Sequence, residues 1–338
     1  MTPIGAPRVR ALEFFSGIGG MHYGLEWAAA DFEIVAAFDI NPTANKCYQH
    51  NFNINPIEKN IQNLNPATFD KFNANCWLMS PPCQPYTRTG KQLDHEDPRA
   101  LGFLFLMDVL AKMEHPPTYI FIENVVNFEF GIPNDRPRYY LTARKQPRNT
   151  LPGSILSHSS LFLGGLSTEW PFLTPFQIEI HTVGEFVEEN VSFSHPPFKI
   201  PERLLKSRGS FDPLVVAVPS HFRTSCFTKA YGRHGVASGA FLQTKGFDED
   251  TAALLNARGA VDKLGLRLFT PTEIARIHGF PIDDKAPKSL HVPKLDGERH
   301  SFSFPEGINI QQQWRLLGNS MCVVVVGEII RQVLLSHE

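Results

Sequence analysis

The stretch Val9–Gly20, VRALEFFSGIGG, decides the fold, because a short apolar run passes directly into a glycine-rich turn. VRALEFF has the nearly continuous apolar character of a strand that is buried on both faces. Met21–Ala30 follows with apolar residues at helical spacing, and Glu33–Ile40, EIVAAFDI, is typical of a second buried strand. Buried strands that alternate with helices indicate a parallel sheet covered on both faces.

The same pattern continues through the first third of the chain. Further short apolar runs and helical patterns lie at Thr43–His50, Cys76–Ser80, Leu101–Met113 and Tyr119–Glu123. Beyond residue 147, prolines, serines and phenylalanines replace the long helical patterns. We therefore predict an α/β domain followed by a second, smaller and partly β domain.

Composition limits the classes of function. The 338 residues are 42% hydrophobic and 20% charged, as in an ordinary globular chain. We expect no membrane span, no disulfide framework and no metal site, since apolar runs are short and the five cysteines form no Cys-x-x-Cys pair. This cysteine usage favours a reducing setting, in the cytoplasm and also the nucleus. A net charge of −2 excludes an overall basic coat, although Lys199–His234 holds seven Lys or Arg against two Asp or Glu.

The glycine turn, Phe15–Gly20, has the spacing Gly-x-Gly-Gly. It lacks the third glycine of Gly-x-Gly-x-x-Gly, so the pyrophosphate fingerprint of dinucleotide-binding proteins is absent. Asp39 ends the following strand, where a carboxylate suits ribose hydroxyls. The turn and the acid predict a nucleoside ligand without a pyrophosphate, and a purely structural tight turn is the alternative.

Two further strand ends carry residues suited to chemistry. Cys83 lies in Ser80–Tyr86, SPPCQPY, where three prolines fix the backbone as a nucleophile requires, and an inert thiol is the alternative. Glu123 ends the apolar run in Ile120–Val125, IFIENV. A carboxyl group buried there is costly for structure and useful as a general acid, while a capping role is the alternative.

The three turns, FFSGIGG, SPPCQPYT and IENV, resemble in this order the motifs of cytosine-5 methyltransferases that use S-adenosylmethionine. Later segments agree: GIPNDRPRYY at 131–140 resembles the arginine motif, FTPTEIAR at 269–276 the support of the target-recognition domain, and RLLGNS at 315–320 the last motif. Ser225–Gly232, SCFTKAYG, resembles the Cys-Phe-Thr signature of the DNA methyltransferase 2 family. That family methylates cytosine 38 in the anticodon loop of aspartate tRNA, so the resemblance implies tRNA as the partner.

The resemblance also implies roles for single residues. Cys83 would add to C6 of the cytosine, and Glu123 would hold or protonate N3. Arg136 and Arg138 would supply fixed positive charge. The residues implied to bind S-adenosylmethionine are Phe15, Ser16, Gly17, Ile18, Gly19, Gly20, Asp39, Ile40, Asn60, Ile61, Pro81, Asn319 and Ser320. Those implied to bind the substrate are Gln84, Arg88, Lys91, Cys226, Phe227, Thr228 and Lys229, with Arg223 and Arg233 as further basic candidates.

The implied architecture is a Rossmann-like methyltransferase sheet with a smaller target-recognition domain. The catalytic domain would span 1–146 and be rejoined by 308–338, with a linker at 147–198 and the recognition domain at 199–307. The family places a helix and a strand before its arginine motif. Only eight residues separate Val125 from that motif at Asn134, too few for a parallel crossover, so one helix–strand unit is predicted to be missing after Val125.

Two other functions stay open. The first is the same chemistry on DNA. The Cys-Phe-Thr segment argues against DNA as the substrate, and with tRNA as the substrate we expect DNA to bind only weakly. The second is a catalytically impaired RNA-binding homologue, whose impairment follows from the deletion between Val125 and Gly131. We expect a monomer in each case.

Overall fold

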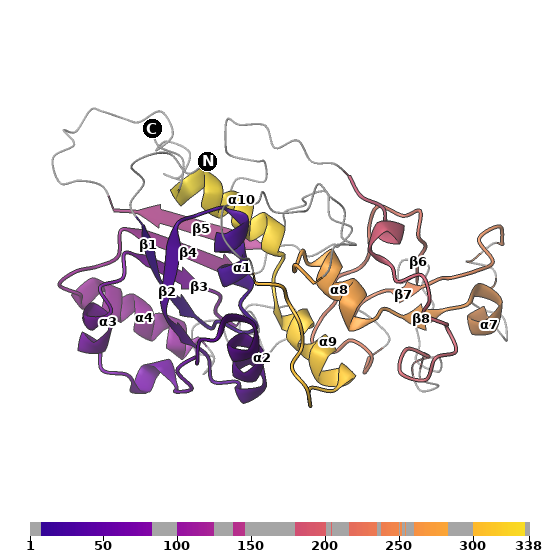
Figure 1. Cartoon of the computed structure of the whole chain (residues 1–338), viewed down its shortest axis with the longest axis horizontal. Helices are drawn as coiled ribbons and strands as arrows, with labels where there is room; N and C mark the ends of the chain where they lie inside the picture. The colour runs from indigo at the N-terminus through magenta and orange to yellow at the C-terminus, as the bar shows by residue number, and fades with distance from the viewer. Residues whose placement is uncertain are drawn as a thin grey trace.

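The computed structural model describes residues 8–82, 100–124, 138–145, 180–200, 204, 216–234, 238–249, 251, 254, 260–282 and 300–334. Figure 1 shows an α/β body with a five-stranded sheet beside a smaller body with a three-stranded sheet. The predicted α/β fold class with a smaller second part is thus confirmed. Among the described residues, no helix has the length and apolar character needed to cross a membrane.

The elements of the larger body come first along the chain. They are β1 (Val9–Phe14), α1 (Gly20–Trp27), β2 (Phe32–Phe38), α2 (Pro42–Phe52), the 3₁₀ turn η1 (Ile61–Asn63), α3 (Ala67–Lys71), β3 (Cys76–Met79), α4 (Leu101–Lys112), β4 (Tyr119–Asn124) and β5 (Tyr139–Arg144). The later elements are η5 (Val183–Phe186), β6 (Val216–Ala217), β7 (Phe241–Leu242), α7 (Ala260–Leu264), β8 (Arg267–Leu268), α8 (Pro271–Ile277), α9 (Ile310–Asn319) and α10 (Val323–Leu334).

The main sheet has the strand order β2-β1-β3-β4-β5. β1 to β4 are parallel, so their carboxyl ends meet at one edge of the sheet. Phe14 of β1 pairs with Met79 of β3, and Met79 with Ile122 of β4. The turns that follow these three strands are therefore neighbours at that edge.

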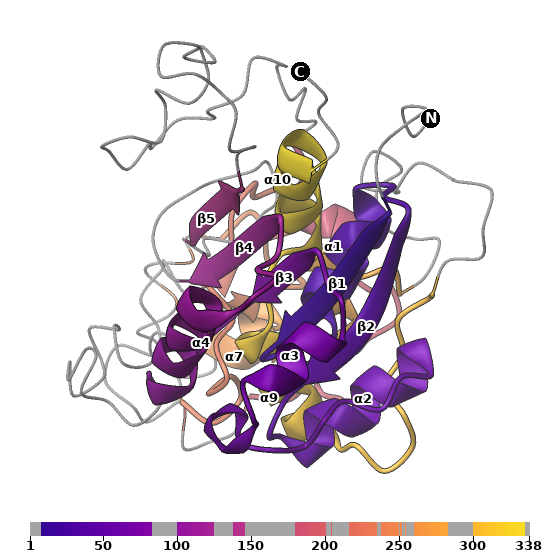
Figure 2. The same cartoon turned by 90° about the vertical axis from the view of Figure 1, so that its left-hand side faces the viewer.

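Both faces of this sheet are buried, which explains the nearly continuous apolar strands. Neighbouring residues of a strand point to opposite faces: Ala11 belongs to the cluster that contains α1, α2 and α10, and Leu12 to the cluster that contains α3 and α4. Figure 2 shows α3 and α4 in front of the sheet and α10 behind it.

The strand β5 runs antiparallel to β4. An antiparallel partner needs no crossover, so a short connection suffices. Residues 125–137, where the helix–strand unit is predicted to be missing, lie outside the described residues, and this loss stays a prediction. Within the described part, β5 is the last strand on its side, and Leu141 is 36% exposed.

The end of the chain returns to the larger body. α10 packs against α1, and the Trp27 indole N–H donates to Glu328 Oε1 at 3.0 Å. Close approach requires glycine here, since a Cβ on Gly327 would lie 2.3 Å from Cδ1 of Trp27. The segment before α9 lies on α2, where Asn51 and Ser303 exchange two hydrogen bonds. The last described part of the chain thus packs against α1 and α2, which lie beside the glycine turn.

Candidate active site

The glycine turn is held against the end of β2. Phe15, Gly17 and Gly19 have φ values of 57°, 55° and 85°, a left-handed region that favours glycine. The Ser16 N–H donates to the Phe38 carbonyl at 3.0 Å, and the Gly17 N–H donates to Asp39 Oδ2 at 2.9 Å. The turn is thus a fixed cradle and Asp39 is locked beside it.

Asp39 presents a positioned carboxylate. Its Oδ1 accepts from the Asn41 N–H at 2.8 Å. Burial raises the pKa of Asp39, and the backbone donors of Asn41 and Gly17 oppose that shift. A carboxylate has about four acceptor positions, so the group keeps acceptor capacity for a ligand hydroxyl beside these backbone donors. The next side chain, Ile40, is 68% exposed, so an apolar surface lies open beside the acid.

Three serines lie in or beside the cradle. Ser16 is 4% exposed, and its Oγ has no hydrogen-bond partner among the described residues. Ser80 Oγ donates to the Phe15 carbonyl at 3.0 Å, which ties the turn after β3 to the glycine turn. A Cβ on Gly20 would lie 3.4 Å from Ser320 Oγ, so the end of α9 reaches the start of α1. The structure thereby brings the first and last predicted cofactor motifs together.

The other predicted cofactor residues differ in exposure. Ile18, Ile61 and Pro81 are buried, and Ile61 lies in the core under α4. Asn60 caps η1, since its Oδ1 accepts from the Gln62 N–H at 3.1 Å. Asn319 is exposed at the end of α9. The side chains of Ile18 and Ile61 thus belong to the core.

Glu123 and Arg138 form an ion pair at the same sheet edge. Nε of Arg138 lies 2.8 Å from Oε1 of Glu123, and the side chains are 11% and 10% exposed. The antiparallel β5 explains the contact, because Asn124 pairs with Tyr139 and the start of β5 therefore meets the end of β4. Two of the four predicted catalytic residues are brought together, and the short connection after Val125 has not separated them.

The remaining predicted residues of this edge lie outside the described residues: Cys83, Gln84, Arg88, Lys91 and Arg136. The chain is described up to Pro82. The Ser80 N–H donates to the Phe14 carbonyl at 3.3 Å, which fixes the entry to the Cys83 turn beside the glycine turn.

The Cys-Phe-Thr segment packs on α9. A Cβ on Gly318 would lie 2.2 Å from the carbonyl carbon of Thr228, so glycine is needed for this contact. Phe227 is 1% exposed, with its ring 5.1 Å from those of Tyr231 and Phe269, whereas Cys226 is half-buried. The ring of Phe227 is thus part of the core. The basic residues Arg223, Lys229 and Arg233 are exposed.

A buried ion pair supports that segment. Arg267 and Glu273 are 1% and 0% exposed, and their side chains meet at 2.6 Å. Thr270 and Glu273 form the reciprocal cap that begins α8. The Phe269 N–H donates to the Tyr231 hydroxyl at 2.8 Å, so the pair, the cap and the aromatic cluster form one unit.

Sequence analysis missed a buried polar network behind the glycine turn. The Tyr48 hydroxyl donates to Glu13 Oε2 at 2.7 Å and lies 3.0 Å from Nδ1 of His22. Burial raises the pKa of Glu13 to about 8, although Tyr48 and two backbone N–H groups oppose the shift. Burial lowers the pKa of His22 to about 3. The signal in the sequence was the single acid inside the apolar run VRALEFF.

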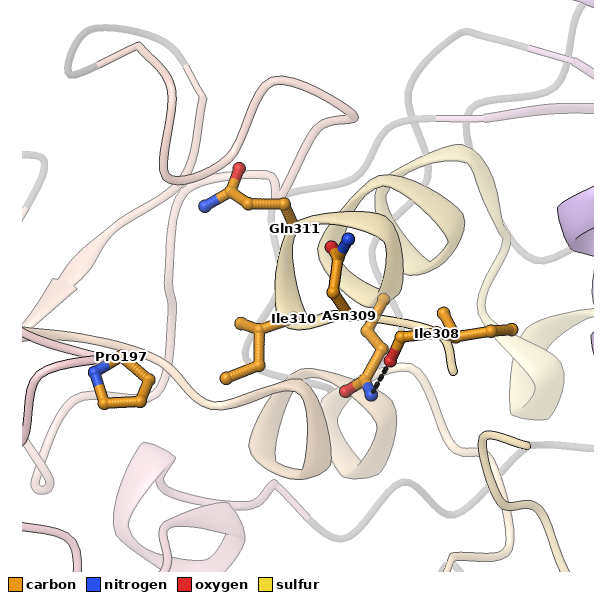
Figure 3. Close-up of a pocket in the computed structure, with 6 residues that line it drawn as sticks. Pro197, Ile308, Asn309, Ile310 and Gln311 are labelled. Atoms are coloured by element: carbon orange, nitrogen blue, oxygen red, sulfur yellow. Dashed lines mark hydrogen bonds between the residues drawn. The ribbon is translucent and has the colours of Figure 1, made fainter. Parts of the chain in front are cut away.

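An open hollow of about 610 Å³ lies elsewhere, at the amino end of α9 (Figure 3). It is lined by Pro197, Ile308, Asn309, Ile310, Gln311 and Gln313. The Gln313 amide donates to the Ile308 carbonyl at 2.9 Å. Since a ten-residue helix is about 15 Å long, this hollow is distant from the Ser320 end of α9.

This chain is similar in sequence and in overall structure to proteins of a known family. A family model described as C-5 cytosine-specific DNA methylase matches residues 9–129. The tRNA (cytosine(38)-C(5))-methyltransferase of Spodoptera frugiperda is 32% identical, over 95% of this chain and 98% of that protein. The DNA (cytosine-5)-methyltransferase of Dictyostelium discoideum is 30% identical, over 98% of this chain and 96% of that protein. A crystal structure of a Spodoptera frugiperda DNMT2 mutant matches with 33% identity and a TM-score of 0.74, over 97% of this chain and 100% of its own.

The sheet, its motif-bearing edge and the family match define the class of protein, a C-5 cytosine methyltransferase. Similarity over nearly the full length goes further: the chain belongs to the Dnmt2 family. The resemblance found in the sequence is confirmed. The alignment with the Spodoptera protein runs over 370 positions, so that protein contains residues without a counterpart among the 338 of this chain.

Proposed function

We propose that this chain transfers a methyl group from S-adenosylmethionine to C5 of a cytosine in tRNA, at position 38 of the anticodon loop of tRNA-Asp. One observation carries the proposal: the glycine cradle, the entry to the Cys83 turn and the Glu123–Arg138 pair follow neighbouring strands at one sheet edge. Relatives from Spodoptera frugiperda and Homo sapiens are named tRNA (cytosine(38)-C(5))-methyltransferases, which supports tRNA as the substrate.

The residues of the cradle fit S-adenosylmethionine. Among the described residues, the buried Ser16 hydroxyl has no hydrogen-bond partner, and a Cβ on Gly17 would meet only the Phe15 carbonyl oxygen, at 3.9 Å. Asp39 offers lone pairs to ribose hydroxyls, and the exposed Ile40 offers an apolar surface to adenine. When bound, S-adenosylmethionine supplies an electrophilic methyl group on a sulfonium. The chain binds and orients it.

The chemistry needs a nucleophile because C5 of cytosine is weakly nucleophilic. The Cys83 thiolate forms a bond to C6, the electron pair of the C5–C6 double bond shifts to C4–C5, and the C4–N3 π pair moves onto N3, which makes C5 nucleophilic. Glu123 gives a proton to N3, where negative charge develops, and the Arg138 guanidinium fixes that carboxyl group at 2.8 Å. The methyl group would end on C5 and leave the donor as a neutral thioether. Loss of the C5 proton to water and elimination of the Cys83 thiolate would then restore the C5–C6 double bond.

A cytosine must leave its stack to reach this edge, and a loop supplies such a base at low cost. The exposed Arg223, Lys229 and Arg233 lie on or beside the segment that packs on α9. Their charge suits RNA phosphates, and binding should weaken with salt.

Transfer of labelled methyl groups to tRNA and to duplex DNA, side by side, tests the proposal. We expect turnover on tRNA, bisulfite mapping to cytosine 38 and complete loss in Cys83→Ala. DNA is the second candidate substrate because the Dictyostelium relative is named a DNA (cytosine-5)-methyltransferase, and faster turnover on DNA would establish it. Calorimetric binding of S-adenosylmethionine without product on either would instead support the impaired RNA-binding homologue.

A further inference from the structure

Three potential metal ligands converge beside α1. His22 and Glu26 lie one turn apart and therefore share a face of this helix. His300 comes from the segment that leads to α9, and its Nδ1 lies 2.6 Å from Glu26 Oε1. Nε2 of His22 lies 4.0 Å from the same oxygen. The three ligand atoms all lie within 4.8 Å of one another.

His22 is held as a metal-binding histidine needs to be held. Its ring stacks on Phe52, with ring centroids 3.7 Å apart and an interplanar angle of 8°. Because the Tyr48 hydroxyl donates to Glu13, its oxygen is available to accept from Nδ1–H of His22. That arrangement leaves the lone pair on Nε2, the nitrogen nearer Glu26. An outer hydrogen bond that ends on a carboxyl group is common behind ligating histidines.

We propose that His22, Glu26 and His300 bind a divalent transition-metal ion, with Zn²⁺ as the best match. Two imidazoles and a carboxylate are a recurrent Zn²⁺ ligand set, and a water completes the tetrahedron. Bond lengths of about 2.0–2.1 Å place tetrahedral ligand atoms about 3.3 Å apart. To reach this spacing, His300 must move away from Glu26, from 2.6 Å, and the side chains of Glu26 and His22 must approach each other, from 4.0 Å. The His300 side chain is 44% exposed, whereas those of His22 and Glu26 are 5% and 10% exposed, so His300 makes the larger shift.

The ion would join two walls of the proposed methyl-donor site. α1 begins at the glycine turn, and the segment after His300 leads into α9, whose end carries Ser320. In Figure 2 this segment runs beside α2, to which Asn51 and Ser303 attach it. A bound ion would thus hold the start of α1 and the approach to α9 together. Metal binding itself does not depend on the proposed methyl transfer.

Titration with Co²⁺, followed by its visible absorption and by competition with Zn²⁺, tests the site on the full chain. We expect one equivalent bound through nitrogen and oxygen ligands, without the thiolate-to-metal band that cysteine ligation would give. His300→Ala should weaken binding at least tenfold, and Zn²⁺ should raise the Tm of the wild type but not of this variant.

His50→Ala is the matched control. His50 is also exposed and also attaches this segment, through Ser303 Oγ at 2.8 Å, but lies outside the three-residue cluster. It should bind Co²⁺ as the wild type does. Glu26→Gln, which keeps the side-chain shape, should lose binding as His300→Ala does. Unchanged affinity in His300→Ala, equal losses in His300→Ala and His50→Ala, or no binding by the wild type would each overturn the proposal.

Discussion

Glu13 and Glu123 are two buried acids in equivalent places with opposite surroundings. Each is the penultimate residue of its strand, in β1 and β4, and they are 1% and 7% exposed. Glu123 faces a guanidinium at 2.8 Å, whereas Glu13 accepts a hydrogen bond from the neutral Tyr48 hydroxyl. One strand end therefore carries a compensated charge, and the other carries a carboxyl group whose pKa is raised to about 8.

The difference shows that burial alone does not make an acid useful for catalysis. A buried carboxyl group without a cation takes up a proton and keeps it, while a nearby cation lowers the cost of ionisation, so the group can give its proton to a substrate. Glu123 also lies where β5 starts, beside the edge shared with the glycine turn, while Glu13 lies behind that turn under α2. The charge of its partner and its position at the sheet edge, more than its depth of burial, distinguish the proposed catalytic acid Glu123 from the structural acid Glu13.

The largest expected effect comes from exchanging each acid for its amide. Glu123→Gln should lower single-turnover methyl transfer to tRNA by about 100- to 10,000-fold, the usual contribution of a positioned acid or base. Glu13→Gln should retain most of the activity, because Glu13 is already largely protonated at pH 7. Equal losses in both variants would contradict the distinction, and circular dichroism of both checks the fold.

The second effect is on stability. Tyr48→Phe removes the hydroxyl bonded to Glu13 and leaves a buried carboxyl group with one donor fewer. We expect a loss of about 1–3 kcal/mol in the free energy of unfolding, the cost of an unsatisfied buried polar group. Urea denaturation measures it. The double variant with Glu13→Gln is the control: because both changes act on one hydrogen bond, their losses should not add.

The three strand-end turns could be predicted because each breaks an apolar run with unusual residues. The Gly-x-Gly-Gly spacing, the prolines before Cys83 and the acid at 123 are local features. The contact between Glu123 and Arg138 is not local, since it depends on β5 running antiparallel, and an apolar run carries no information on strand direction.

Other features escaped prediction for the same reason. Glu13 meets Tyr48 across 35 residues of sequence, and His300 meets Glu26 across 274. The signature segment implies a substrate contact for Phe227, and the burial of its ring could not be predicted from that segment. Composition and spacing indicate which residues are chemically capable, while tertiary packing decides which of them meet.

The third effect is a pH dependence. The pKa of Glu13 is raised from 4.5 to about 8, so the folded state binds more protons than the unfolded state in this range, and stability falls as pH rises through it. The pKa of His22 is lowered from 6.5 to about 3, which gives the opposite slope below pH 6.5. The Glu13 slope, at most about 1.4 kcal/mol per pH unit, should therefore emerge between pH 6.5 and 8.

Denaturation of the wild type and of Glu13→Gln at several pH values isolates this contribution. The stability difference between them should shift toward the variant as pH rises to 8 and then level off. A difference that does not change with pH would mean that Glu13 has an ordinary pKa in the folded protein.

The smallest effect concerns a third buried acid, Glu328, which is 6% exposed and accepts from both Trp27 and Arg331. Nε of Arg331 lies 3.0 Å from Oε2 of Glu328, but the arginine side chain is 44% exposed. Solvent screens such a cation, so Arg331→Ala should cost about 0.5 kcal/mol in urea denaturation, far less than Tyr48→Phe. A loss as large as that of Tyr48→Phe would show that a cation at the surface stabilises a buried carboxylate strongly despite the solvent around it. The contrast between Glu13 and Glu123 would then rest on charge alone, without the enclosure that the sheet edge provides.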